Sequence, residues 1–237
     1  MEDVALLDVD AALRALAEIV PPDQLRVATH SGGGLAVTMA LARRPEWQAL
    51  IARMALYCCQ ANDAARSMGR RVALCVALRL TQWRGHIPGR ALRLGVCDES
   101  HHMMRPWFRW NLTGRFLGAD GFDYGQAQQA MPMPVMAIAG SKDRWIAPPE
   151  ACERFWQRFA QARQRGQFVR CGIDHGHRQE HNHVSPMHSA AARAEILPAV
   201  VEWLAQPTSC GLAPAIDVHS ATHHAATPLA VSAYSSI

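Results

Sequence analysis

Short apolar runs alternate with stretches of helical periodicity along most of this chain. Four of the runs are predicted as strands, over residues 24–30, 50–59, 134–140 and 167–172. The run from Pro134 to Ala139 is wholly apolar, which is typical of a strand buried on both faces of a parallel sheet. A helical pattern or a longer insertion separates each run from the next. We therefore expect an α/β fold with four parallel strands in sequential order, joined by right-handed crossovers.

Helical patterns are predicted between and after these strands. Val9, Leu13, Leu16 and Val20 recur at helical spacing behind Asp8, a candidate N-cap, and Pro21 and Pro22 end that helix. Further helices are predicted from the glycines after the first strand to Arg44, over 63–83, over 149–165, and in a last stretch that ends near Leu204. Residues 84–130 are rich in Trp, Arg, Gly and Met and follow no single period. From Pro207 onward apolar periodicity is lost, which favours a disordered tail over 207–237.

Composition narrows the function classes. With 237 residues and 49% hydrophobic content, the chain is long enough to bury a full core. The formal charge is +4, and the arginines are dispersed along the sequence, so neither nucleic acid nor an anionic membrane is implied as a partner. No run approaches the ~20 apolar residues of a membrane span.

The cysteines and the first residues of the sequence indicate the cellular compartment. The seven cysteines show no CxxC motif and no framework spacing, which favours reduced thiols in a cytoplasmic protein. The acidic N-terminal residues differ from the basic start of a signal peptide.

Candidate chemistry lies at the ends of the predicted strands. The run from Leu25 to Thr29 leads into His30-Ser31-Gly32-Gly33-Gly34, and a serine at a sharp strand-to-helix turn needs such small neighbours. Asp143 follows the strand at 134–140, and a histidine-rich loop, 174–183, follows the strand at 167–172. Open α/β sheets keep catalytic groups at the carboxyl ends of their strands. Ser31, Asp143 and a loop histidine are therefore expected at one edge of the sheet.

These motifs resemble those of the α/β-hydrolase family. The segment Thr29-His30-Ser31-Gly32-Gly33 is similar to its nucleophile elbow, although Thr29 stands where the family usually has glycine. The stretches AIAGSKDRWIAPPEACERF and HNHVSPMHSAAARAEILPAVVEWL resemble the acid-bearing and histidine-bearing segments of a lysophospholipase-like or serine-aminopeptidase-like branch. Residues 64–130, including MMRPWFRWNLTGRF, resemble its cap insertion. The resemblance covers most of residues 8–205.

The resemblance implies a serine hydrolase that cleaves an ester or other acyl bond without a cofactor or metal. Ser31 would be the nucleophile, Asp143 the acid, His183 the general base, and Gly32 would supply an oxyanion-binding N–H. His175, His177 and His181 in the same loop remain alternatives to His183. The substrate would be a small acyl compound, with an apolar group. The cap side chains Arg105, Trp107, Phe108 and Trp110 are expected to serve packing rather than substrate contacts.

The resemblance also implies a division of the chain. Residues 1–63 and 131–206 would form the two parts of the hydrolase core, 64–130 the helical cap, and 207–237 the tail. The family has several strands, and the loop with its second oxyanion donor, ahead of the elbow, whereas thirty residues precede Ser31 here. This favours an N-terminally truncated hydrolase, through a misplaced start, a fragment or a decayed gene. Leu25 to Thr29 would then form an exposed sheet edge prone to edge-to-edge self-association, and activity would be low.

Three other interpretations stay open. Alternating histidines in 174–183 are of the type that binds zinc, which would make the chain a zinc-dependent hydrolase. Ser31 to Gly34 would cradle a phosphate at a helix N-terminus, although both GxGxxG and GK[ST] are missing. The chain would otherwise be an inactive hydrolase remnant or an interaction module.

Overall fold

A computed structural model describes residues 1–91 and 97–207 of the chain. Its centre is a parallel sheet of four strands in the order β1-β2-β5-β6. The strands are β1 (Leu25–His30), β2 (Ile51–Tyr57), β5 (Val135–Gly140) and β6 (Gln167–Cys171). The predicted parallel, sequential sheet is confirmed. The predicted strand at 50–59 ends earlier, at Tyr57, because Cys58 turns the chain with a positive φ of 48°.

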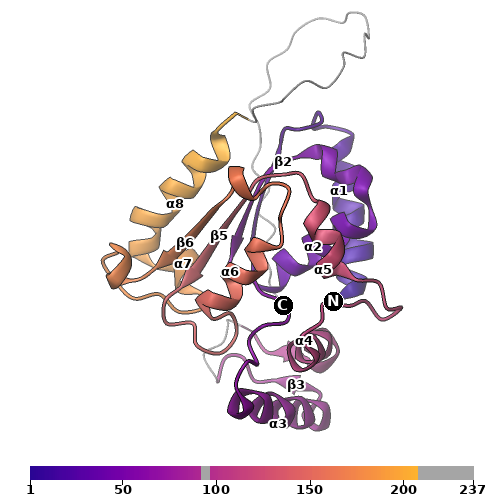
Figure 1. The fold of residues 1–237 in the computed structure, drawn as a ribbon, viewed down its shortest axis with the longest axis vertical. Helices are drawn as coiled ribbons and strands as arrows, with labels where there is room; N and C mark the ends of the chain where they lie inside the picture. Colours follow the sequence, from indigo (N-terminus) through magenta and orange to yellow (C-terminus); the bar gives the residue numbers. More distant parts are fainter. Residues whose placement is uncertain (92–96, 208–237) are drawn as a thin grey trace, which may run out of the picture.

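Helices cover both faces of this sheet (Figure 1). They are η1 (Val4–Val9), α1 (Asp10–Ala17), α2 (Gly32–Arg43), η2 (Pro45–Leu50), α3 (Met68–Arg84), α4 (His101–Thr113), α5 (Tyr124–Ala127), η3 (Gln128–Ala130), α6 (Pro149–Gln157), η4 (Arg163–Arg165), η5 (Ile173–His175), α7 (Ser185–His188) and α8 (Ala190–Ala205). Two short strands, β3 (His86–Ile87) and β4 (Glu99–Ser100), pair antiparallel outside the main sheet.

The side chains of β2 show how the two faces are filled. Met54 and Leu56 pack into the cluster that holds α2 and α6, whereas Ala55 and Tyr57 pack into the cluster that holds α8. Successive side chains of a strand point to opposite faces, so an unbroken apolar run is what a strand covered on both sides requires. Every residue of β2 and of β5 is buried.

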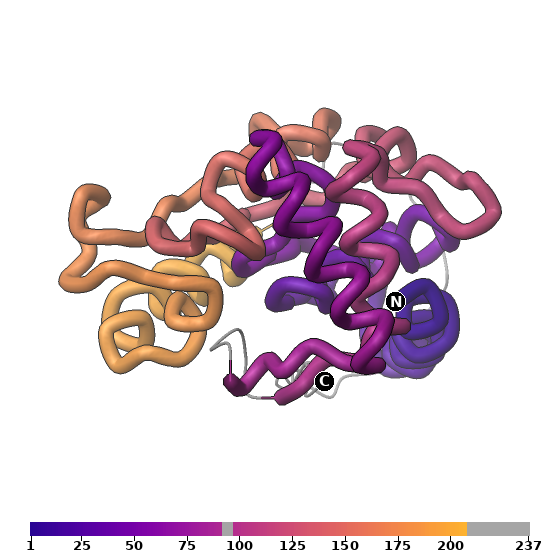
Figure 2. Tube along the Cα trace, turned by 90° about the horizontal axis from the view of Figure 1, so that it is seen from below, coloured from indigo at the N-terminus to yellow at the C-terminus, as the bar shows by residue number. Residues whose placement is uncertain are grey.

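The segment between β2 and β5 contains α3 and α4, which pack against each other, and α5, which packs against α2. Figure 1 shows α3 and α4 at one end of the molecule, away from α8. In Figure 2 the same two helices lie side by side. Helix α4 was not predicted, because Pro106 and a mixture of histidine, arginine and tryptophan hide its period. Trp107, Phe108 and Trp110 of α4 are buried in the main core cluster, and Arg105 is exposed.

Several predicted helix boundaries are wrong. The first helical segment begins at Val4 and ends at Ala17, so Asp8 lies inside it and is no N-cap. The helix predicted over 63–83 is α3, which begins at Met68 behind the N-cap Ser67. The helix predicted over 149–165 ends at Gln157 and is followed by a short 3-10 turn.

Strand β1 lies at the end of the sheet order and pairs with β2 alone among the described residues. The predicted edge position of Leu25 to Thr29 is therefore confirmed. The tail proposed for 207–237 lies, except for Pro207, outside the described residues. Within the described chain, every helix is too short or too polar to cross a lipid bilayer.

Candidate active site

Ser31 occupies a strained turn between β1 and α2. Its backbone has φ 51° and ψ −120°, a conformation that L-residues rarely adopt, and its N–H donates to the Tyr57 carbonyl at 2.8 Å. A Cβ built on Gly34 would lie 3.0 Å from Thr29 Oγ1 of β1 and 3.3 Å from Leu56 Cδ2 of β2, so the first turn of α2 approaches the sheet closely there. This is the strand–turn–helix geometry that the small residues around Ser31 predict.

Asp143 lies in the loop after β5 and is held from two sides. Its Oδ1 accepts the N–H of Ile146 at 3.2 Å, and its Oδ2 accepts the N–H of Ala147 at 3.1 Å. The side chain of His183 completes the arrangement, with Nδ1 at 2.5 Å from Asp143 Oδ2. Asp143 is buried, with 4% of its surface exposed, so its carboxylate is fixed and shielded from water.

His183 connects Asp143 to Ser31. Its Nε2 lies 2.9 Å from Ser31 Oγ. Because a carboxylate only accepts hydrogen bonds, Nδ1 carries the proton toward Asp143, which leaves Nε2 free to accept the Ser31 hydroxyl proton. The structure thus joins Ser31, His183 and Asp143 in one hydrogen-bonded chain at the carboxyl ends of β1 and β5.

The loop that bears His183 is anchored to the end of β5. Lys142 N–H donates to the His181 carbonyl at 2.7 Å, and Ser141 Oγ bonds the carboxylate of Glu180. A Cβ on Gly140 would come within 2.6 Å of the His181 carbonyl oxygen, so a glycine at this position lets the two backbones meet.

The other loop histidines take no part in this chain. His175 is exposed and His177 is half-buried, and neither ring bonds Ser31 or Asp143. His181 is fully buried, and both of its ring nitrogens lack a partner within the described residues. Residues 174–183 also fail to bring three metal-ligating atoms together, so the zinc interpretation of this loop is not supported by the geometry.

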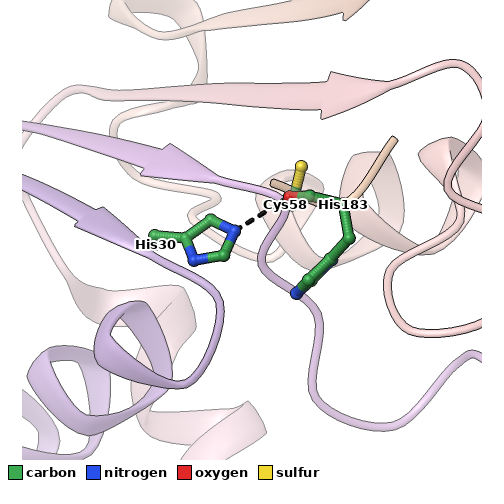
Figure 3. A group of neighbouring side chains, drawn as sticks. All are labelled: His30, Cys58 and His183. Carbon is green, nitrogen blue, oxygen red and sulfur yellow. Dashed lines mark hydrogen bonds between the residues drawn. The ribbon is translucent and has the colours of Figure 1, made fainter. Parts of the chain in front are cut away.

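His30, next to Ser31, is a site residue that the sequence analysis missed. Its Nε2 lies 2.8 Å from the His183 carbonyl oxygen, and the two rings are 4.8 Å apart between centroids (Figure 3). Burial, together with the nearby His183, lowers the pKa of His30 to about 4. His30 is therefore neutral at pH 7 and donates its Nε2–H to the main chain that carries His183.

Cys58 lies beside the two histidines. Ligand atoms of His30, Cys58 and His183 lie within 4.8 Å of one another. The three side chains would have to move closer together before they could bind one metal ion. Both ring nitrogens of His183 are already engaged, and Figure 3 shows the Cys58 sulfur and the His183 ring pointing in different directions. Burial also raises the pKa of the Cys58 thiol, which opposes metal ligation by the thiolate.

A small cavity of about 30 Å³ opens beside Ser31 and has room for about two water-sized groups. It is lined mainly by apolar side chains: Met1, Leu35, Cys58, Met104, Trp107, Ile146 and Ala147, together with Ser31, Gly32 and Gln60. Trp107, expected to serve packing, therefore also lines the cavity. Sequence pattern offered no signal for this role, since Met104 and Trp107 reach Ser31 only through the packing of α4.

Comparison with known proteins shows the fold. A hydrolase from Oleispira antarctica superposes with a TM-score of 0.54 at 15% identity, covering 86% of this chain and 71% of that one. A monoacylglycerol lipase from Paleococcus ferrophilus gives a TM-score of 0.52 at 18% identity, covering 84% and 73% respectively. An esterase from Pyrococcus furiosus gives 0.52 at 16% identity, covering 85% and 62%. The chain has an α/β-hydrolase fold.

The comparisons by sequence add nothing to the structural ones. No family model matches the chain, and no curated protein matches it. At 15–18% identity these three structural neighbours share only the fold with this chain. A function for the chain has to be argued from its own residues, because one fold hosts many functions.

Proposed function

We propose that the chain is a serine hydrolase that cleaves an ester or other acyl bond. The observation that supports this most strongly is the hydrogen-bonded chain from Ser31 Oγ through His183 to Asp143, at 2.9 and 2.5 Å. The strained backbone of Ser31 adds to it, because strain of this kind presents a nucleophile to substrate.

In this mechanism His183 Nε2 takes the proton of Ser31, and Ser31 Oγ attacks the carbonyl carbon of the substrate. Asp143 keeps the imidazole in the tautomer that accepts at Nε2 and stabilises the imidazolium that forms. The developing oxyanion would accept the Gly32 N–H, because the first N–H groups of α2 have no partner inside the helix. His183 then protonates the leaving group, and water, activated by the same imidazole, hydrolyses the acyl-enzyme.

His30 acts as a positioning residue in this scheme. Since burial keeps its ring neutral, it adds no positive charge beside the imidazolium of His183. Its hydrogen bond to the His183 carbonyl fixes the main chain from which the base projects.

The cavity favours a particular acyl group. Its lining is mainly apolar, and its volume of about 30 Å³ accepts a short acyl chain rather than a long one. Esters of short apolar acids are therefore the proposed substrates, with Trp107 and Met104 limiting the length of the acyl group. The more specific lysophospholipase-like activity would require α4 to move away from Ser31.

The test is turnover of a short-chain aryl ester by the wild type and two variants. Ser31→Ala and His183→Ala should each lower kcat by ~10³-fold or more, since members of such a unit fail together. His175→Ala, in the same loop and exposed, is the matched control and should keep full activity. Full activity in Ser31→Ala would contradict the proposal. A wild type that hydrolyses no acyl ester would favour the inactive remnant or interaction module instead.

A further inference from the structure

The outward face of α3 carries a row of exposed apolar side chains. Met68, Val72, Val76 and Leu80 follow one another at intervals of four residues, and Trp83 continues the row. Between 52% and 84% of each side chain is exposed, with Trp83 the most exposed of the five. Residues three and four apart on a helix lie on the same side, so these five form one continuous apolar strip. Single exposed apolar residues are ordinary, but a strip of this length marks an interaction surface.

The rest of α3 shows that this strip faces away from the protein. Leu74, Ala77 and Leu78 pack against the main core cluster, and the buried Thr81 bonds His101 of α4 at 3.2 Å. Figure 1 shows α3 at the lower margin of the molecule, with α4 alongside it. In Figure 2, seen from below, α3 lies in front. Helix α3 is therefore held by one face, and the strip lies on the other.

The strip is accompanied by positive charge only. The sequence between Asp63 and Asp98 contains seven arginines and no acidic residue. Arg79 and Arg84 are exposed, close to Leu80 and Trp83, and neither forms an ion pair within the described residues. The dispersed arginines of the sequence thus gather, on this helix, around an exposed apolar strip.

We propose that the outward face of α3 docks on the surface of anionic phospholipid membranes. A helix that lies in the bilayer interface presents apolar side chains to the acyl region and cationic side chains to anionic headgroups, and tryptophan favours that boundary. A second copy of this chain fits less well, because two copies of this uniformly basic helix would repel each other. The expectation that the arginines do not imply an anionic membrane is revised here for α3 alone.

Docking would bring the cap region to the bilayer. Helix α4, which packs on α3, supplies Met104 and Trp107 to the cavity beside Ser31. An ester dissolved in the membrane would then lie near the cap. This last consequence rests on the proposed function, whereas docking itself does not.

The test is co-sedimentation of the full chain with vesicles of phosphatidylcholine, with and without phosphatidylglycerol. The wild type should bind the anionic vesicles, and added salt should weaken binding. The double variant Val72→Glu/Leu80→Glu should reduce the partition coefficient about tenfold or more, and Arg79→Gln/Arg84→Gln should reduce the preference for anionic vesicles. The matched control is Leu197→Glu/Val201→Glu on α8, whose two side chains are 46% and 56% exposed, and it should bind like the wild type.

Absence of binding to anionic vesicles would overturn the proposal, as would equal loss of binding in the α8 control. A wild-type dimer that becomes monomeric in Val72→Glu/Leu80→Glu, without vesicle binding, would overturn it in favour of a second copy. Vesicle binding is also measured on Ser31→Ala. If the wild type binds anionic vesicles but hydrolyses no ester, the docking proposal is supported and the proposed function is wrong.

Discussion

His30 lies directly before the candidate nucleophile, and its ring lies against the ring of His183. Nothing in the sequence marks it out, because its role depends on a hydrogen bond to a carbonyl in a distant loop. The same is true of Cys58, Met104 and Trp107, which reach Ser31 through tertiary packing. Ser31, Asp143 and His183 differ, since each follows a predicted strand and the carboxyl ends of parallel strands meet at one edge.

The first prediction concerns His30 as a positioning residue. His30→Phe keeps an aromatic ring but loses the hydrogen bond to the His183 carbonyl. It should lower kcat on a short-chain ester roughly tenfold, with KM little changed, because one positioning hydrogen bond is lost. His30→Asn retains a donor and should recover part of the rate. A Phe variant with wild-type kcat would show that His30 only packs.

The second prediction follows from the pKa of His30, which burial lowers from 6.5 to about 4. Between these values the unfolded chain binds a proton at His30 that the folded chain does not. The free energy of unfolding should therefore fall as pH falls through this window, by at most about 1.4 kcal/mol per pH unit from this group. His181, whose pKa burial also lowers, acts in the same direction.

Urea unfolding at neutral and mildly acidic pH measures this dependence. His30→Asn removes the contribution of His30, so its free energy of unfolding should fall less on acidification than that of the wild type. An identical fall in both proteins would mean that His30 titrates normally in the folded state.

At the scale of elements, the strands were easier to predict than the helices. The unbroken apolar runs of β2 and β5 require burial on both faces, so the sequence predicts that these strands lie inside the sheet. Helix α4 was not predicted, because Pro106 interrupts its pattern and arginines separate its apolar side chains. The end of β2 at Tyr57 was also not predicted, because the apolar run continues through Cys58 and Cys59 and the positive φ of Cys58 leaves no mark in the sequence.

The third prediction concerns the contact of α2 with the sheet. A Cβ on Gly34 would meet Cys59 Sγ at 2.8 Å and Thr29 Oγ1 at 3.0 Å, whereas a Cβ on Gly33 would meet its nearest atom, in Thr29, at an ordinary 3.8 Å. Gly34→Val should therefore lower the free energy of unfolding by about 1–3 kcal/mol through overpacking. Gly33→Ala should leave stability unchanged or raise it by up to about 1 kcal/mol.

Thermal and urea unfolding of both glycine variants provide the measurement. Since Gly34 packs beneath the turn that bears Ser31, its variant should also lose activity. Equal stability of the Gly34 and Gly33 variants would show that α2 shifts to accept a side chain without cost.

At the scale of the whole molecule, β1 lies at the edge of the described sheet. Its outer backbone groups face no partner strand within the described residues, and unpaired edges invite association.

The fourth prediction is that the chain self-associates as its concentration rises. Sedimentation velocity over a range of concentrations should show a growing fraction of oligomers. The association should persist in Val72→Glu/Leu80→Glu, because it uses β1 and not the strip on α3. A monomer at every concentration would show that the edge is protected in solution.

The central claim is that Ser31 is a nucleophile activated by His183, and covalent labelling with a fluorophosphonate tests it most directly. Intact mass spectrometry should show one adduct on the wild type, and peptide mapping should assign it to Ser31. His183→Ala should label at least ~10²-fold more slowly, and Ser31→Ala should not label at all. An unlabelled wild type, or an adduct that persists in Ser31→Ala, would contradict the account.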